Sequence, residues 1–252
     1  MEATSFVLAS SVYMASIYTK DLPFNYISQK EGICKELGGN FCSRLSFSVV
    51  TTFFYSLYTY LTAYLSLPVR NALNDSPSAY TSGAAVGAFL AATSILVNIF
   101  GGFIDVKGID WSKVWFIPSI IVAMHLTAST EEILYRALPI NALRSYISEH
   151  LLVLLTALVF GYVHSDQSLF YGLTTTISGL LFGYGFLRYG LYWATGAHSI
   201  FNIVETSFYT VANVRVKNSL MAGERTTPDD DGLTGGVVEL AALLALKRIG
   251  YI

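Results

Sequence analysis

Apolar segments separated by short polar stretches run along almost the whole chain. A membrane-spanning helix needs about 20 consecutive, mostly apolar residues. Segments of this character are 6–18 (short), 45–67, 80–104, 114–128 and onward, 151–163, 169–187, 191–211 and 233–246. The pattern predicts an all-α fold, a polytopic membrane helix bundle with seven or eight transmembrane helices. We expect residues 1–252 to form a single integral membrane domain.

Polar stretches mark the predicted loops. Two of them are 105–113 and 215–231, and the second carries Pro228 and three consecutive aspartates, which makes it the most soluble-looking part of the chain. Lys and Arg are divided between alternate loops with only a shallow bias, so the positive-inside rule does not fix the orientation. The sequence therefore predicts an integral membrane protein without identifying the membrane.

Composition supports the membrane assignment and excludes some partners. Of 252 residues, 53% are hydrophobic and 13% charged, whereas a soluble domain carries about 25% charged residues. The net charge of −2 gives no electrostatic bias toward nucleic acid. We expect membrane lipid and a membrane-anchored protein or peptide as partners. Cys34 and Cys42 share the first predicted loop, and two cysteines do not fix a redox compartment.

Glu131 and Glu132 are adjacent within apolar sequence, and Arg136 follows one helical turn later. A single acid at the centre of a membrane helix costs roughly 2.5–3.5 kcal/mol. Positions four apart share a helix face, whereas neighbours diverge by about 100°. Glu132 is therefore predicted to pair with Arg136, which leaves Glu131 for chemistry. Taken alone, the motif is equally typical of a salt bridge at a helix end near the membrane surface.

Two histidines follow on later apolar segments. His164 ends the segment 151–163, with Phe160 one turn earlier on the same face, and taken alone it is typical of an interfacial residue. His198 and Asn202 are four residues apart on one helix face. Such polar residues can also simply form hydrogen bonds that hold neighbouring membrane helices together.

Two further polar residues lie near these motifs. His125 precedes Glu132 by seven residues, so it either lines the same cavity or is a core histidine with its own hydrogen-bond partner. Glu205 lies roughly on the helix face of His198 and Asn202.

The order E-E-x-x-x-R, F-x-x-x-H and H-x-x-x-N, each motif on its own apolar segment, resembles the CAAX-protease and bacteriocin-processing (CPBP, or Abi) family of intramembrane endopeptidases. This family includes the Ras-converting type CAAX prenyl endopeptidases. The resemblance covers roughly 114–211, the predicted catalytic helices. The matching residues are Glu131, Glu132, Arg136, Phe160, His164, His198 and Asn202.

The resemblance implies peptide-bond hydrolysis of a membrane-associated, CAAX-type or other, protein or peptide. It implies that Glu131 and His164 activate a water, and that His198 and Asn202 form the oxyanion pocket. Glu132 and Arg136 would brace the site. No cofactor is favoured, although zinc held by Glu131, His164 and His198 would satisfy the three-ligand count of a catalytic site.

Two other functions stay open. One is a membrane scaffold or bacteriocin self-immunity protein of the same fold, which binds a peptide without cutting it. The other is a transporter or proton channel in which Glu, His and Arg side chains form a relay. A transporter would be expected to show internal inverted repeats and broken helices in matching halves, and the sequence shows neither pattern.

Overall fold

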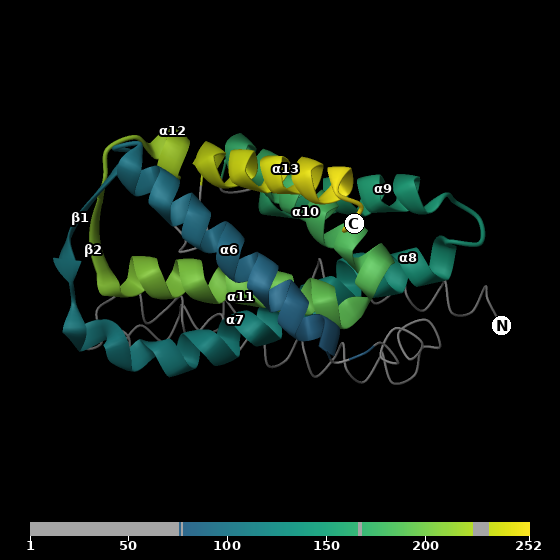
Figure 1. The fold of residues 1–252 in the computed structure, drawn as a ribbon, viewed down its shortest axis with the longest axis horizontal. Helices are drawn as coiled ribbons and strands as arrows, with labels where there is room; N and C mark the ends of the chain where they lie inside the picture. The colour runs from purple at the N-terminus through teal and green to yellow at the C-terminus, as the bar shows by residue number, and fades with distance from the viewer. Residues whose placement is uncertain (1–75, 77, 166–167, 224–231) are drawn as a thin grey trace, which may run out of the picture.

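The computed structural model describes residues 76, 78–165, 168–223 and 232–252, and these residues are mostly helical (Figure 1). The predicted spans 6–18 and 45–67 lie outside the described residues, as do Cys34 and Cys42. The total of seven or eight transmembrane helices therefore stays a prediction.

Six long helices coincide with predicted apolar segments. They are α6 Ser78–Phe100, α7 Ile117–Glu132, α9 Glu149–His164, α10 Leu169–Tyr189, α11 Leu191–Val211 and α13 Gly232–Arg248. Among the described residues, Ser78–Phe100 and Trp111–Leu143 are long and apolar enough to cross a membrane. The second stretch joins the 3₁₀ helix Trp111–Phe116, α7, the π-helical turn Ile133–Ala137 and α8 Leu138–Leu143.

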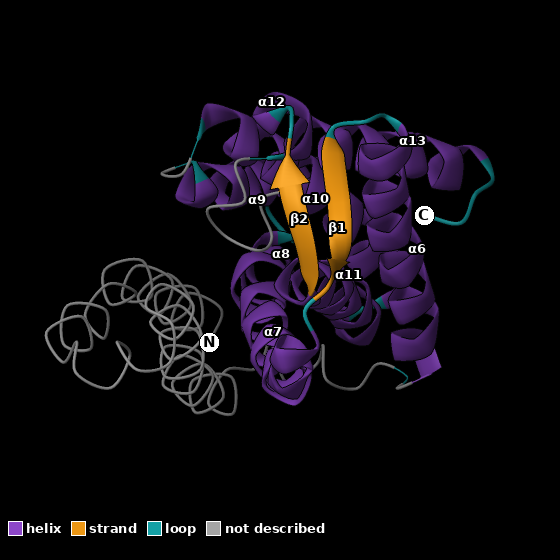
Figure 2. Ribbon diagram, turned by 90° about the vertical axis from the view of Figure 1, so that its left-hand side faces the viewer, coloured by secondary structure: helices purple, strands orange, loops and turns teal. Residues whose placement is uncertain are grey.

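The prediction of a purely α-helical chain is incomplete, because two predicted loops contain strands. β1 Ile104–Ile109 pairs antiparallel with β2 Ala212–Val216 (Figure 2). A bulge interrupts the register between Val106 and Ile109, where Gly108 has φ 148°. β1 contains Ile and Val and β2 contains two Val residues, and such β-branched residues favour strands. Their pairing joins residues more than a hundred positions apart, which no local pattern reveals. The short helix α12 Ser219–Ala222 follows β2.

Glycines allow α6 and α11 to pack closely. A Cβ added to Gly83 would lie 2.1 Å from the Trp193 carbonyl oxygen, and one added to Gly87 would lie 2.1 Å from that of Ala197. Because both contact positions advance together along the chain, the two helices run in the same direction. Small residues at the contact let the backbones meet, as is usual between membrane helices. This contact fixes α11 and therefore the position of His198.

The helices α9 and α10 pack antiparallel to each other, unlike α6 and α11. A Cβ on Gly161 of α9 would lie 2.4 Å from the Gly172 carbonyl oxygen, and one on Gly179 of α10 would lie 2.9 Å from Ala157 Cα. The contact positions thus run in opposite directions, so the helices are antiparallel. The end of α9, with His164, consequently lies beside the beginning of α10.

Candidate active site

The first part of the site forms where α7 changes into a π-helical turn. The turn Ile133–Ala137 directly follows Glu132 and precedes Pro139, which has no N–H to donate to a carbonyl one turn earlier. The Leu138 N–H instead bonds to the Ile133 carbonyl, five residues back. Single π turns inside α-helices are frequent at functional sites. Here the turn carries Arg136 immediately beyond the two glutamates.

Glu132 is completely buried and paired with a cation. Its Oε1 lies 3.1 Å from NH1 of Arg136, which is also completely buried. The pairing predicted from helical spacing is present as an ion pair through one carboxylate oxygen. The side-chain nitrogens of Arg136 make no identified hydrogen bond, so the bidentate fork is not formed. The Arg136 guanidinium carbon also lies 4.3 Å from the centre of the Phe160 ring, a cation–π contact.

Glu131 has a different environment from its neighbour. Its side chain is 19% exposed. Its Oε1 lies 3.9 Å from Nε2 of His164, and its Oε2 lies 3.6 Å from Nε2 of His198. Adjacent residues diverge around a helix, and the structure shows the consequence: one carboxylate is buried against a cation, and the other faces two imidazoles and remains accessible.

The hydrogen bond of His164 determines which of its nitrogens faces Glu131. Its Nδ1 lies 2.7 Å from the Phe160 carbonyl oxygen. Because a carbonyl only accepts, Nδ1 must carry the hydrogen. In the neutral ring, Nε2 is therefore an acceptor that points toward Glu131. The Phe160 ring packs on this imidazole at 4.5 Å, as the sequence predicts, and Tyr171 of α10 contacts it edge-on at 5.9 Å.

His198 joins the two glutamates from the other side of the site. Its Nδ1 donates to Oε1 of Glu132 at 2.8 Å, and its Nε2 faces Glu131. The ring of Phe182 on α10 stacks on the imidazole, with centroids 4.9 Å apart and planes 17° from parallel. The imidazole is thus held by one hydrogen bond in its plane and one aromatic ring on its face.

The structure brings together Glu131, Glu132, Arg136, His164 and His198. Asn202 is buried on α11, one helical turn beyond His198 and on the same face. Sequence reasoning missed Tyr171 and Phe182, which contact the two histidines from α10. Aromatic residues in an apolar helix resemble ordinary core residues, so their sequence positions carried no usable signal.

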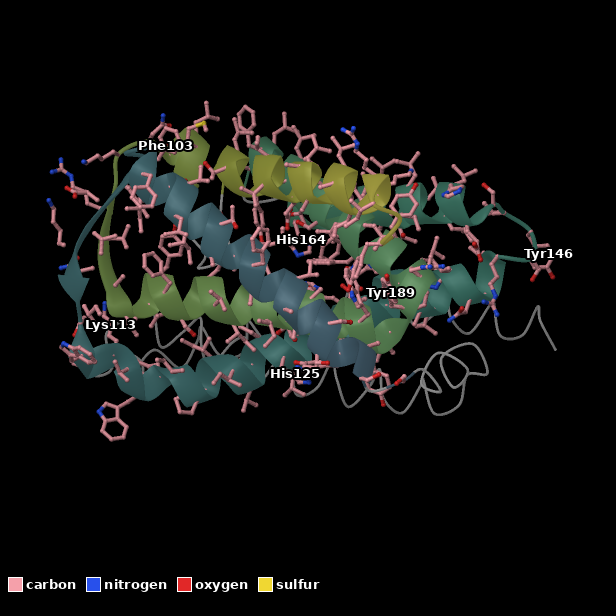
Figure 3. All side chains as sticks on the ribbon, viewed as in Figure 1. Phe103, Lys113, His125, Tyr146, His164 and Tyr189 are labelled. Atoms are coloured by element: carbon pink, nitrogen blue, oxygen red, sulfur yellow. The ribbon has the colours of Figure 1, made fainter. Side chains whose placement is uncertain are left out.

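His125 belongs to a separate polar group. Its Nδ1 lies 3.3 Å from the Tyr80 hydroxyl, which lies 3.1 Å from Ser199 Oγ. His125 and His164 are well apart in the bundle (Figure 3). Of the two interpretations of His125, the structure favours a histidine with its own hydrogen-bond partner.

A catalytic zinc would require Glu131, His164 and His198 to converge on one point. In the described part of the chain, no three His, Cys, Asp or Glu side chains are grouped as metal ligands, and Glu131 faces the two imidazoles with different oxygens. The 3.9 Å between Glu131 and His164 exceeds a direct hydrogen bond and is a separation that a water can bridge. A water therefore fits between Glu131 and His164.

Comparison with known families gives one result. Residues 113–204 match the family described as type II CAAX prenyl endopeptidase Rce1-like. All seven motif residues, from Glu131 to Asn202, fall inside this segment, whereas β2, α12 and α13 lie beyond it. No curated protein matches the chain. The match agrees with the resemblance based on the three motifs.

Proposed function

We propose that this chain, whose residues 113–204 match the type II CAAX prenyl endopeptidase Rce1-like family, is an intramembrane endopeptidase that uses a water activated by Glu131 and His164. The observation that carries the proposal is the contrast between the adjacent glutamates. Glu132 is buried in an ion pair with Arg136, while Glu131 is accessible and faces Nε2 of both histidines.

The first step is the attack of water on the peptide carbonyl carbon. A water between Glu131 and His164 donates to the carboxylate and to Nε2, both of which are acceptors. Glu131 takes one proton as the oxygen–carbon bond forms, which is general base catalysis. The carbonyl π electrons move to oxygen and give a tetrahedral oxyanion. The proton is then delivered to the amide nitrogen as the C–N bond breaks, leaving a carboxylic acid and an amine.

The oxyanion is stabilised by His198 and Asn202. The Nδ1 hydrogen of His198 is already used by Glu132, so His198 can donate to the oxyanion only when Nε2 also carries a proton. The imidazolium lies between two carboxylates. With Glu131 and Glu132 negative and Arg136 and His198 positive, the four groups are neutral together, which limits the cost of burying charge.

The proposed substrate is a membrane-associated protein or peptide, with a prenylated CAAX-type C-terminus as the first candidate because of the family match. The two candidate spans support a site within a membrane protein. We expect seven or eight transmembrane helices in the whole chain. The same geometry without turnover would leave a peptide-binding scaffold or immunity protein, so hydrolysis itself is the property to test.

The decisive experiment is to incubate the purified protein in detergent with a prenylated C-terminal peptide and to follow cleavage by mass spectrometry. The wild type should cleave with and without a chelator, and Glu131→Gln should not cleave. Glu149→Gln, which changes an exposed glutamate at the start of α9, serves as the matched control. Cleavage by Glu131→Gln at the wild-type rate would overturn the mechanism. Loss of cleavage with chelator, restored by zinc, would replace it with a metal-dependent one.

A further inference from the structure

A second buried acid lies outside the proposed site, on α13. Glu239 is 1% exposed, and its Oε2 lies 2.6 Å from Oγ of Ser178 on α10. Its Oε1 is buried without a hydrogen-bond partner. Glu205 on α11 is also completely buried and lies close enough to influence the Glu239 carboxyl electrostatically. Both glutamates follow the segment that matches the protease family.

The hydrogen atoms around Ser178 indicate the protonation state of Glu239. Ser178 Oγ lies 2.6 Å from Glu239 Oε2 and 3.2 Å from the Thr174 carbonyl oxygen. A hydroxyl has one hydrogen, and a carbonyl only accepts. If Glu239 were ionised, Ser178 would have one hydrogen for two acceptors. If Glu239 carries a proton on Oε2, it donates to Ser178, Ser178 donates to Thr174, and both contacts are made.

The charged residues around α13 also favour a protonated Glu239. The helices α6 and α12, which pack against α13, contain no charged residue. On α10 the only charged residue is Arg188, ten positions beyond Ser178, and on α13 itself Lys247 and Arg248 are at the far end. Among the described residues, the ionisable group identified near Glu239 is Glu205, another acid. An ionised Glu239 would thus be a buried charge beside another acid, an arrangement that favours protonation.

The bond between Glu239 and Ser178 connects α13 to the helix that supports both histidines. Ser178 is seven residues after Tyr171 and four before Phe182, so the three share one face of α10. Tyr171 contacts His164, and Phe182 stacks on His198. Near Ser178 the two helices are in close contact, because a Cβ added to Gly236 would lie 2.7 Å from Thr174 Cγ2.

We infer that Glu239 is an uncharged, protonated carboxylic acid that fastens α13 to α10 and thereby acts as a positioning residue for His164 and His198. The protonation and the fastening stand independently of the enzyme activity. Only the positioning of the histidines rests on the proposed function.

Infrared spectroscopy of the purified protein in detergent tests the protonation directly. A protonated carboxyl has a carbonyl stretching band that a carboxylate lacks. At neutral pH the wild type should show this band, and Glu239→Gln should lose it. Glu205→Gln and Glu149→Gln should keep it, so they are the buried and exposed controls. A wild-type band that survives in Glu239→Gln, or a wild type without the band, would overturn the inference.

Thermal unfolding tests the fastening without any substrate. The amide of Glu239→Gln can still donate to Ser178, so its midpoint should stay close to that of the wild type. Glu239→Ala loses the donor and should unfold at a lower temperature, as should Ser178→Ala to a smaller extent. If Glu239 acted as an ionised carboxylate, Glu239→Gln would be destabilised like Glu239→Ala, and the inference would fail.

Steady-state cleavage then tests the positioning. In Glu239→Ala we expect kcat to fall by about tenfold or more with little change in KM, since misplacement of catalytic groups lowers turnover. Glu239→Gln should restore kcat. An unchanged kcat in a folded Glu239→Ala protein would refute the positioning role. If the wild type cleaves no peptide, the proposed function fails, while the infrared and unfolding results still decide the state of Glu239. If Glu239→Ala does not fold, Glu239→Gln and Ser178→Ala supply the comparison.

Discussion

The bundle contains two pairs of glutamates whose surroundings differ. In the first pair, Glu132 contacts Arg136 and His198, and Glu131 faces two imidazoles. In the second pair, Glu239 has only the Ser178 hydroxyl as an identified partner, and Glu205 lies near it. Glu132, Glu205 and Glu239 are all completely or almost completely buried, so the difference between Glu132 and the second pair lies in the partners and not in the depth of burial.

This contrast shows two ways of keeping acids inside an apolar bundle. A carboxylate can remain charged when a cation and a hydrogen-bond donor are fixed beside it, as for Glu132. Without a cation, the less costly state is the protonated acid, as inferred for Glu239. The first arrangement leaves a charged base available for chemistry, and the second leaves a neutral hydrogen-bond donor that holds helices together. Replacing a glutamate by the neutral glutamine should therefore harm the first pair and leave Glu239 nearly unaffected.

The largest effect is expected within the first pair. Glu131→Gln keeps the volume but removes the base, so turnover should fall by about 10²–10⁴-fold with little loss of stability. Glu132→Gln should lose less activity but more stability, because it leaves the buried Arg136 without its carboxylate. Peptide cleavage and thermal unfolding of both variants in detergent provide the measurements. A stable, inactive Glu132→Gln beside a fully active Glu131→Gln would reverse the two roles.

Removing the cation should make the first pair resemble the second. Arg136→Ala leaves the buried Glu132 with His198 but without its guanidinium partner, and breaking a buried ion pair in this way costs about 3–5 kcal/mol. Arg136→Lys keeps the charge but loses the planar contact with Phe160, so we expect an intermediate loss. The free energy of unfolding would be measured in detergent. Arg144→Ala, at an exposed position just beyond α8, is the control. Wild-type stability and activity in Arg136→Ala would show that the ion pair is dispensable.

A smaller effect is expected from the packing that carries His198 toward the first pair. A side chain at Gly87 meets the α11 backbone, which cannot move away as a flexible side chain could. Gly87→Ala should thus separate α6 from α11, with a loss of about 1–3 kcal/mol typical of overpacking and a reduced cleavage rate. Ala85→Val, at an exposed position on the same helix, controls for added volume. Equal stability of the two variants would contradict the close contact.

The first pair could be anticipated from the sequence because its information is local. Glu132 and Arg136 are four residues apart, and helical spacing alone predicts their pairing and the divergence of Glu131. The apolar segments likewise predicted the long helices, since length and composition determine whether a helix suits a membrane. The contacts of His164 and His198 with Glu131 came from the family resemblance, because no spacing connects three different helices.

The features that were missed depend on contacts between distant segments. Glu205 was noted only as a polar neighbour, and Glu239 gave no signal, because its partner Ser178 is 61 positions away on another helix. The strands β1 and β2 were assigned to loops for the same reason. Phe182 and Tyr171 look like ordinary apolar residues until the packing of α10 places them on the histidines.

The smallest effect should come from an acid that has cations, like Glu132, but is not buried. Asp105 on β1 lies beside Lys107 and Lys217. The hydrogen bond from Lys107, with help from both positive charges, holds the pKa of Asp105 below its usual value of 3.8. A lowered pKa means that the ionised form stabilises the fold. This contribution is present above pH 3.8 and is lost as the pH falls through the lowered pKa.

Because Asp105 is only partly buried, solvent and salt screen these contacts, and the effect on the whole protein should be slight. Acidification to about pH 3 should therefore loosen only the β1–β2 ribbon. Amide hydrogen exchange would be compared between the wild type and Asp105→Asn at both pH values, which cancels the intrinsic pH dependence of exchange. We expect faster ribbon exchange in the variant at neutral pH, a smaller difference at pH 3, and unchanged exchange in α11. A ribbon difference at pH 3 as large as that at neutral pH would show that the charge of Asp105 is not its cause. A global destabilisation as large as that of Arg136→Ala would show that cationic partners matter as much without burial.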